Sequence, residues 1–348
     1  MATMATPIYE FSQVPGTRAT QATARADRVR VPGEAPRVGV IYNPRSHGNQ
    51  GADFDCGISP HVHIAQPGDR SQLPDALAEF AALQIDLLVI NGGDGTVRDV
   101  LTCGAPIFGD DWPALAVLPK GKTNALTVDL GVSRHWTLQN AIDALDGGRR
   151  IRRRPVAITR LDSDDASELF GFIMGAGAFT TATRAGQSAH RLGAFNAMAV
   201  GVTTLWGVAQ WLFATRGNAW RRGAKMTIGL GAGEVPMAHS GHGDPAWRQI
   251  VFATTLETLP AGLRPFGKLR DGLRLAALDQ IDRRSALSLP GVLRGKTGPH
   301  LREKGIHQVA TPHFTLDIAD QFIFDGEAFP AGRYRVGQGP ELEFVTAP

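Results

Sequence analysis

The segment that most limits the possible folds is the glycine-rich motif Asn91-Gly92-Gly93-Asp94-Gly95-Thr96. It follows an apolar run at 87–90, which is typical of a buried strand, and it precedes a stretch at 97–101 that predicts a helix. Glycines let the backbone approach a phosphate group closely, and the start of a helix offers free N–H groups and a positive dipole. The order of strand, glycine loop and helix therefore favours a phosphate-binding turn.

The details of this motif narrow the choice further. Thr96 and Asp99 have the spacing of a capping box, which places the predicted start of the helix at Thr96. The pattern is neither GxGxxG nor GxxxxGK[ST], which counts against an ordinary dinucleotide-binding dehydrogenase and against a P-loop nucleotide hydrolase. The structural alternative is a plain glycine turn closed by the Asp94 side chain, although such a turn needs only one glycine.

Strands and helices alternate over residues 37–150, which indicates an open α/β sheet. We expect strands from residue 37 and over 87–90 and 114–118, and helices over 73–83, 97–101 and 124–130, with Gly131 as the C-terminal glycine of the last one.

The loops after the first and third of these strands are also polar. They read Asn43-Pro44-Arg45-Ser46-His47-Gly48 and Pro119-Lys120-Gly121-Lys122-Thr123-Asn124. Because ligands bind beyond the carboxyl ends of the strands in such sheets, we expect the three loops to meet at one site. There Lys122 would neutralise phosphate oxygens, and Asn43, Thr123 and Asn124 would form hydrogen bonds to them. Each loop by itself is better explained as an ordinary turn.

The pattern changes after the arginine-rich run at 149–154, which is either a solvated edge strand or a contact for phosphate or anionic lipid. Strands with few helices between them are expected over 156–161, 169–174, 225–230, 249–255, 273–278, 314–318 and 321–324. We therefore predict a loose arm at 1–36, an α/β domain at 37–150, a β-rich antiparallel domain at 151–330, and a last segment, 331–348, that returns to the first domain.

Composition excludes several classes of protein. The 348 residues are long enough for two domains. A net charge of +3 is too weak to indicate nucleic acid binding, but it suits an anionic ligand or an anionic membrane surface. Two cysteines, Cys56 and Cys103, cannot build a disulfide scaffold or a zinc module. No basic-then-apolar leader pattern opens the sequence, so we expect a cytoplasmic protein.

One uncharged stretch, 192–215, is long enough to span a bilayer. Glycines interrupt it, and Asn196, Thr203 and Gln210 fall seven residues apart, which favours an amphipathic helix instead. The apolar face of this helix is expected to line an acyl-chain pocket or to enter a membrane interface. It consists of Phe195, Met198, Val202, Trp206 and Phe213.

A late motif, Asp325-Gly326-Glu327, follows an apolar strand. Taken alone, two carboxylates around a glycine favour a simple hairpin turn, and the alternative is a catalytic pair.

Together, the glycine motif, the P-x-G-x-x-N loop at 119–124 and the late Asp325-Gly326-Glu327 resemble the diacylglycerol kinase catalytic family, which includes sphingosine, ceramide and bacterial lipid kinases. NAD kinases are more distantly similar. The resemblance spans about residues 37–345. It implies an N-terminal open α/β nucleotide domain and a C-terminal antiparallel β-sandwich, with ATP and a lipid meeting in the cleft.

The resemblance also implies roles for individual residues. Asn43 and Ser46 would belong to the first nucleotide loop, and Lys122, Thr123 and Asn124 to the second. The residues that would cradle the ATP phosphates are Gly92, Gly93, Asp94, Gly95 and Thr96. Asp94 would also help to hold Mg²⁺. Asp325 matches the general base of bacterial lipid kinases, with Glu327 supporting it, and Asp94 is the competing candidate for the base.

The implied activity is that of an ATP- and Mg²⁺-dependent lipid kinase at the inner face of a membrane. Its acceptor would be a hydroxyl group of a ceramide, a sphingoid base or a diacylglycerol. Departures from the family pattern are Lys122 in place of threonine and Ala125 in place of a final aspartate. The alternatives are a kinase of NAD or another soluble alcohol, and a non-catalytic lipid-binding relative.

Overall fold

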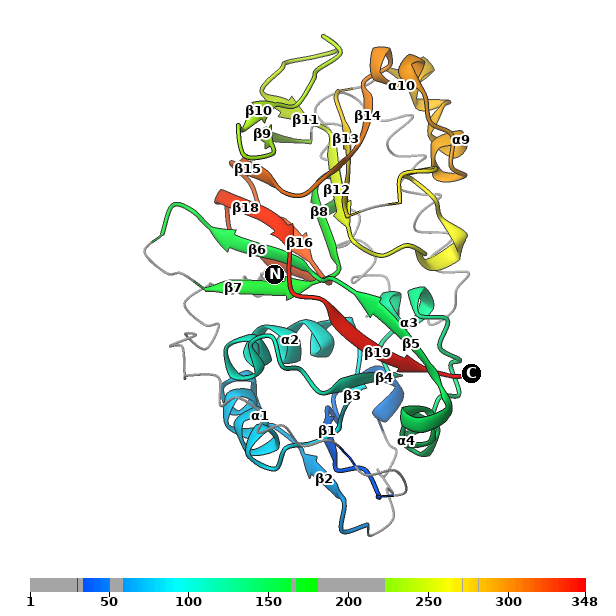
Figure 1. The fold of residues 1–348 in the computed structure, drawn as a ribbon. Helices are drawn as coiled ribbons and strands as arrows, with labels where there is room; N and C mark the ends of the chain where they lie inside the picture. The colour runs from blue at the N-terminus through cyan, green and yellow to red at the C-terminus, as the bar shows by residue number, and fades with distance from the viewer. Residues whose placement is uncertain are drawn as a thin grey trace, which may run out of the picture.

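The structure, a computed structural model, describes residues 30, 34–50, 59–163, 167–180, 223–270, 272–280 and 282–348. Two halves lie one above the other in Figure 1. The N-terminal half is built on a mostly parallel six-stranded sheet, and the C-terminal half on two antiparallel sheets. The predicted fold class, an α/β domain followed by an antiparallel β-sandwich, is confirmed.

The first sheet takes its strands from both ends of the described chain. Their order is β2 (Val62–Ala65), β1 (Val38–Tyr42), β3 (Leu87–Gly92), β4 (Ala114–Pro119), β19 (Leu342–Thr346) and β5 (Arg149–Arg153). β19 lies parallel to β4, and β5 pairs antiparallel to β19 at the edge. Figure 1 shows β19, in red, running beside β4 and β5. The last strand of the sequence thus completes the sheet begun by the first.

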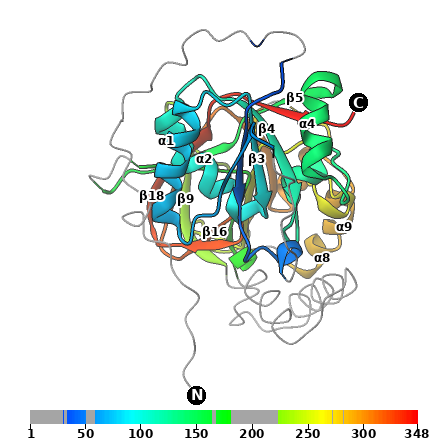
Figure 2. The same ribbon diagram turned by 90° about the horizontal axis from the view of Figure 1, so that it is seen from below.

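Helices cover both faces of this sheet, as Figure 2 shows for α1 and α2 on one side and α4 on the other. The helices are α1 (Leu73–Ala82), α2 (Asp94–Phe108), α3 (Ala125–Asp129) and α4 (Leu138–Gly147), with single 3₁₀ turns η2 (His47–Asn49) and η3 (Arg70–Gln72). Leu77, Phe80 and Val100 pack on one face with Leu88 and Ile90. The other face buries Ala141 and Leu145 of α4 against its alternate strand residues. Burial on both faces explains why these strands are continuous apolar runs.

The two sheets of the C-terminal half pack face to face. The first has the order β10 (Val235–Pro236), β9 (Ala224–Leu230), β15 (Phe314–Ile318), β18 (Gly332–Gln338), β6 (Val156–Arg160) and β7 (Glu168–Gly171), and β11 (Trp247–Arg248) also pairs with β9. The second has the order β14 (Ile306–Thr311), β13 (Leu273–Leu278), β12 (Ile250–Thr254), β8 (Ile173–Gly177), β16 (Phe322–Phe324) and β17 (Glu327–Phe329). Phe314 and Tyr334 of the first sheet share one buried core with Val251, Leu275 and Phe322 of the second.

Short helical elements stand outside this sandwich. They are η4 (Pro260–Gly262), α8 (Arg283–Ala286), α9 (Leu289–Leu293) and α10 (Pro299–Glu303).

Some predictions made from the sequence differ from the structure, and one concerns residues outside the described part of the chain. The run at 169–174 is two strands, β7 and β8, separated at Phe172, because the chain there leaves one sheet of the sandwich for the other. The helix expected at 192–215 lies outside the described residues, with its apolar side chains. In the part of the chain that the structure describes, no helix combines the length and the apolar character needed to cross a bilayer.

The arginine-rich run forms an edge strand, β5, as one of its two interpretations required. Arg150 pairs with Glu343 at 3.2 Å, and Arg152 pairs with Glu341 at 3.4 Å, on and beside the neighbouring β19. Cross-strand ion pairs therefore use at least part of the positive charge of this run.

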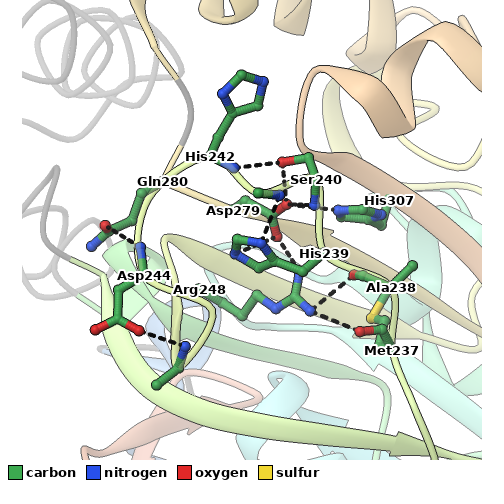
Figure 3. Close-up of polar contacts among 12 residues, drawn as sticks. Met237, Ala238, His239, Ser240, His242, Asp244, Arg248, Asp279, Gln280 and His307 are labelled. Atoms are coloured by element: carbon green, nitrogen blue, oxygen red, sulfur yellow. Dashed lines mark hydrogen bonds and ion pairs between the residues drawn. The ribbon is translucent and has the colours of Figure 1, made fainter.

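A buried charged cluster around Asp279 links the two sheets of the C-terminal half (Figure 3). Asp279 forms an ion pair with Arg248, whose Nη2 also donates to the carbonyl oxygens of Met237 and Ala238. The other carboxylate oxygen accepts hydrogen bonds from the Ser240 backbone N–H at 2.8 Å and hydroxyl at 2.7 Å, and lies 2.9 Å from His307 Nε2. Burial opposes ionisation, but the hydrogen bonds from His307 and Ser240 outweigh it and lower the pKa of Asp279 to about 2.

Replacing Asp279 with Asn should lower the free energy of unfolding by about 3–5 kcal/mol at neutral pH, because the buried Arg248 loses its anion. In the native chain the pKa of Asp279 is lower than its ordinary value of 3.8, so its stabilisation is complete above about pH 4 and is lost as the pH falls toward 2. Urea unfolding of both proteins near pH 7 and near pH 3 checks this. Asp317→Asn, at an exposed position of β15, is the control. An equal gap between Asp279→Asn and the native protein at both pH values would contradict the assignment.

Candidate functional site

The glycine motif forms the turn between β3 and α2. Helix α2 begins at Asp94 with Gly93 as its N-cap, so the predicted start at Thr96 is wrong. The side chains expected to form the capping box have other partners: Thr96 Oγ1 accepts a hydrogen bond from Asn43 Nδ2 at 2.8 Å, and Asp99 pairs with arginines. A helix of 15 residues thus points its free N–H groups toward the turn.

The three predicted loops meet, as the parallel sheet requires. The loop after β1 is fixed to the end of β3 by Asn49, whose Nδ2 donates to Asn91 Oδ1 at 2.9 Å. The loop after β4 lies against the glycine turn so closely that a Cβ on Gly93 would be 2.8 Å from the Gly121 Cα. Only a backbone without side chains at these two positions allows this approach.

Asn124 shapes the second loop instead of projecting from it. It adopts a left-handed conformation with φ of 51°, its Oδ1 accepts from the Gly121 N–H at 2.7 Å, and its Nδ2 donates to the Gly121 carbonyl at 2.8 Å. Lys122 and Thr123 are exposed. None of the three lines the cleft described next, so their proposed contacts with phosphate stay a prediction.

A cleft of about 660 Å³ opens in front of the glycine turn. The predicted site residues among its walls are Asn43, Ser46, Gly93, Gly95, Thr96 and Glu327. The remaining wall residues, which sequence reasoning did not assign to the site, are Arg45, Asp69, Arg70, Ser71 and Asp99. Residues separated by up to about 280 positions in the chain therefore surround one polar space.

Asp325 lies in the turn between β16 and β17, with a positive φ of 43°. Its two carboxylate oxygens accept hydrogen bonds from the backbone N–H groups of Phe172 and Ile173, each at 2.9 Å. Burial and the nearby Asp94 raise the pKa of Asp325 to about 7, against the opposing effects of Arg98 and of the two N–H groups. A carboxylate with this pKa can take up and release a proton near neutral pH.

Neither Asp94 nor Asp325 is among the residues that line the cleft, and the Asp94 side chain faces the start of α3. Its Oδ1 accepts from the Leu126 N–H at 3.4 Å. Burial raises the pKa of Asp94, while backbone N–H groups of Ala125, Leu126 and Asn124 act in the opposite direction. Asp94 and Asp325 therefore come from opposite halves of the chain and influence each other's charge.

A network of two arginines and two carboxylates links α2 to the β16–β17 turn. Arg98, with 1% of its surface exposed, lies 2.8 Å from Asp99 and 3.1 Å from Glu327 and donates to the Phe324 carbonyl at 3.2 Å. Arg70 bridges the same two carboxylates. Burial opposes the charge of Arg98, but Asp99 and Glu327 outweigh it and raise the pKa of its guanidinium. This arrangement fixes Glu327 beside the turn that carries Asp325.

Sequence reasoning missed Arg70 and Arg98, and it gave Asp99 a capping role. An arginine two residues after a glycine motif looks like an ordinary helix-surface residue. The available signal was an excess of negative charge, because Asp94, Asp325 and Glu327 in one predicted site need cations near them.

Comparison with known proteins gives this arrangement a context. Residues 37–158 match the family model of the diacylglycerol kinase catalytic domain. A diacylglycerol kinase of Bacillus subtilis (strain 168) is 33% identical over 124 residues, which cover 33% of this chain and 39% of that protein. A lipid kinase, YegS, of Escherichia coli (strain K12) is 31% identical over 77 residues, or 22% of this chain and 25% of that protein. The chain thus spans less than half the length of these relatives.

The fold extends the likeness. The crystal structure of a diacylglycerol kinase from Bacillus anthracis str. Sterne superposes with a TM-score of 0.54 over 90% of this chain and 97% of that one, at 16% identity. At that identity the superposition shows a shared fold alone. The family resemblance noted in the sequence is confirmed over residues 37–158, and over most of the chain the fold is shared.

The position of the Asp325 carboxylate depends on the absence of a side chain at Gly171, the last residue of β7. A Cβ there would be 2.3 Å from Asp325 Oδ2 and 2.6 Å from Phe324 Cζ. We therefore expect Gly171→Ala to displace the carboxylate and to lower the free energy of unfolding by about 1–3 kcal/mol. Urea denaturation measures the change.

Gly147→Ala in α4 is the matched control, because a Cβ there meets nothing within 4 Å. That substitution should leave stability unchanged or raise it by up to about 1 kcal/mol. Equal effects of the two substitutions would show that the space at Gly171 is not limiting.

Proposed function

We propose that this chain, whose residues 37–158 match the diacylglycerol kinase catalytic domain, is an ATP-dependent lipid kinase. It would transfer the γ-phosphate of ATP to a hydroxyl group of a ceramide, a sphingoid base or a diacylglycerol-type lipid. The observation that carries the proposal is the Asp325 carboxylate, which has a pKa of about 7 and stands close enough to Asp94 of the glycine turn to be affected by its charge. A base beside a phosphate-binding turn is the arrangement that phosphoryl transfer to an alcohol requires.

In this proposal the nucleotide phosphates lie against the start of α2. The N–H groups of Gly93, Asp94, Gly95 and Thr96 and the helix dipole stabilise negative charge there. Asn43 and Ser46 approach from the loop after β1, on the same cleft. Lys122 and Thr123, exposed on the second loop, would reach the phosphates by a change of side-chain conformation.

The residues present suit a Mg²⁺ ion that arrives with the nucleotide and do not suit a preformed cage. Among the described residues, no three His, Cys, Asp or Glu side chains are arranged so that they could hold a metal ion. Mg²⁺ is usually held by one or two carboxylates and by substrate phosphates, and it neutralises phosphate charge. Asp94, as the family resemblance implies, would help to hold it, and Asp69 offers a second carboxylate on the wall of the cleft. Interaction with Ser71 keeps the pKa of Asp69 below its usual range, so that this carboxylate is ionised.

The acceptor hydroxyl would lie beside Asp325. As the hydroxyl oxygen forms its bond to the γ-phosphorus, the bond to the bridging oxygen of ADP breaks and Asp325 takes the hydroxyl proton. Glu327 does not act as a second base in this account, since Arg70 and Arg98 already pair with it. It positions the turn. An enzyme with a lipid substrate would work as a peripheral protein at the inner face of a membrane.

The direct test is transfer of labelled phosphate from ATP to diacylglycerol, ceramide, sphingosine and NAD, each with and without Mg²⁺. We expect a labelled lipid and a dependence on the metal. Labelled NAD alone would favour a kinase of a soluble alcohol. No transfer to any acceptor, together with retained lipid binding, would favour a non-catalytic relative, for which the replacement of the family aspartate by Ala125 is an argument.

Asp325→Asn should lower kcat by about 100-fold or more, because a positioned base contributes about 10²- to 10⁴-fold. In the unsubstituted protein, kcat/KM should rise as the pH increases through about 7 and level off above it, since only the ionised carboxylate accepts a proton. Initial rates from about pH 5.5 to pH 9 measure both effects. Asp317→Asn should leave the rate and its pH profile unchanged.

The same pH profiles distinguish Asp325 from Asp94, the competing candidate for the base. If Asp325→Asn keeps both full turnover and the rise near pH 7, the assignment of the base is wrong and Asp94 becomes the candidate. Asp94→Ala should abolish transfer under either assignment, because it also removes the carboxylate that anchors the start of α3.

A further inference from the structure

The short helices α8, α9 and α10 form a small unit with its own core at the outer edge of the C-terminal half (Figure 1). Ala286, Val292 and Leu301 pack there against Leu278 of β13 and Ile306 of β14. Leu289 of α9 packs against these buried residues as well, whereas Leu287 and Leu293 are not part of this core.

The preceding loop, 259–270, is attached to the same unit. The Arg264 N–H donates to the Leu293 carbonyl at 2.8 Å. Gly267, with a positive φ of 57°, lies so close to Gly295 and Thr297 that a Cβ would be 2.7 Å from the Gly295 carbonyl oxygen. Lys304 Nζ donates to Ser288 Oγ at 3.1 Å, which joins the start of α9 to the end of α10. We call residues 259–270 and 282–304 together the outer face.

Leucines point outward from the outer face. Leu287 has 75% of its surface exposed, the highest value among the large apolar residues that the structure describes, and Leu263 and Leu293 have 40% and 39%. A single exposed leucine is ordinary on a protein surface. Three on adjoining segments, none of them part of the core beneath, offer apolar contact surface that the described residues leave uncovered.

The charge of the outer face is strongly positive. Its two stretches contain nine lysine and arginine residues against two acidic ones, Asp282 and Glu303. The Asp282 side chain already has a hydrogen-bond partner, because it accepts the N–H of Ser285 as the N-cap of α8. Arg294, Lys296 and Arg302 are exposed and close in sequence to the exposed leucines. By contrast, the arginines of β5 include two that already pair with glutamates.

We propose that the outer face docks on an anionic lipid bilayer. Lysines and arginines near an anionic leaflet each strengthen attraction about fivefold, and apolar side chains among them enter the interface. A nucleic acid would use the positive charge but not the leucines, so the combination favours the bilayer. This inference deepens the proposed lipid kinase function, because it assigns the surface through which the protein would reach a lipid substrate. Only the biological role of the docking rests on that function, and the docking itself does not.

The test is co-sedimentation of the full chain with vesicles of phosphatidylcholine alone and of phosphatidylcholine mixed with phosphatidylglycerol. We expect binding to the mixed vesicles only, and weaker binding as salt rises. The double substitution Arg294→Glu, Lys296→Glu should weaken this binding by about tenfold or more. Leu287→Ser with Leu293→Ser should weaken it as well, although the net charge is unchanged.

The matched control is Lys225→Glu with Val235→Ser on β9 and β10, which Figure 1 shows on the other flank of the C-terminal half. Lys225 and Val235 are both exposed, so the control replaces one cation and one apolar side chain that lie outside the outer face. It should bind vesicles as the native protein does. Circular dichroism confirms that each variant is folded.

Binding that is equal for the native protein and both outer-face variants would overturn the proposal, and so would equal binding to neutral and anionic vesicles. Binding to single-stranded DNA in place of vesicles, lost in the glutamate variant, would assign the surface to nucleic acid and contradict it too. Phosphate transfer to detergent-dispersed lipid is measured separately. If transfer is absent but vesicle binding follows the outer face, the proposed function fails and this inference stands.

Discussion

The arrangement of the site depends on one buried cation, the guanidinium of Arg98. It belongs to the helix that starts at the glycine turn, and it contacts the carbonyl of Phe324 and the carboxylate of Glu327 on the far hairpin. A charge withdrawn from water to this extent is stable only while its partners stay in place. The two halves of the chain are therefore fixed relative to each other at the point where the chemistry would occur. Thr102 adds to this contact by accepting the backbone N–H of Phe170 at 3.0 Å.

The contact between the two halves of the chain also sets the pKa and the orientation of the Asp325 carboxylate. Its carboxylate is removed from water, lies near another carboxylate and is still held by two backbone N–H groups. The first two conditions raise its proton affinity, and the last fixes its direction. Arg98 is near enough to limit the rise, so that the pKa stops at about 7. Position and basicity thus follow from the same contacts, and neither can be altered alone.

Sequence patterns predicted what depends on neighbouring residues. The run at 87–90, the glycine motif and the apolar run at 114–118 each carry a local signal, and each forms the expected strand or turn. Their convergence also followed, because parallel strands end at a common edge. The helix start at Thr96 was wrong because Thr96 and Asp99 bind residues that are distant in sequence, Asn43, Arg70 and Arg98, and no spacing rule includes such partners. The exposed position of Lys122 had no local signal either.

The position of β19 has a consequence for synthesis of the chain. Its neighbour β4 ends 223 residues before β19 begins, and its other neighbour, β5, ends 189 residues before it. At ordinary ribosomal speeds of about 5–20 residues per second, the edge of β4 stays without its partner for on the order of ten seconds or longer. Unpaired strand edges are templates for aggregation. A newly made N-terminal half would therefore need either a chaperone or rapid burial of this edge by other segments.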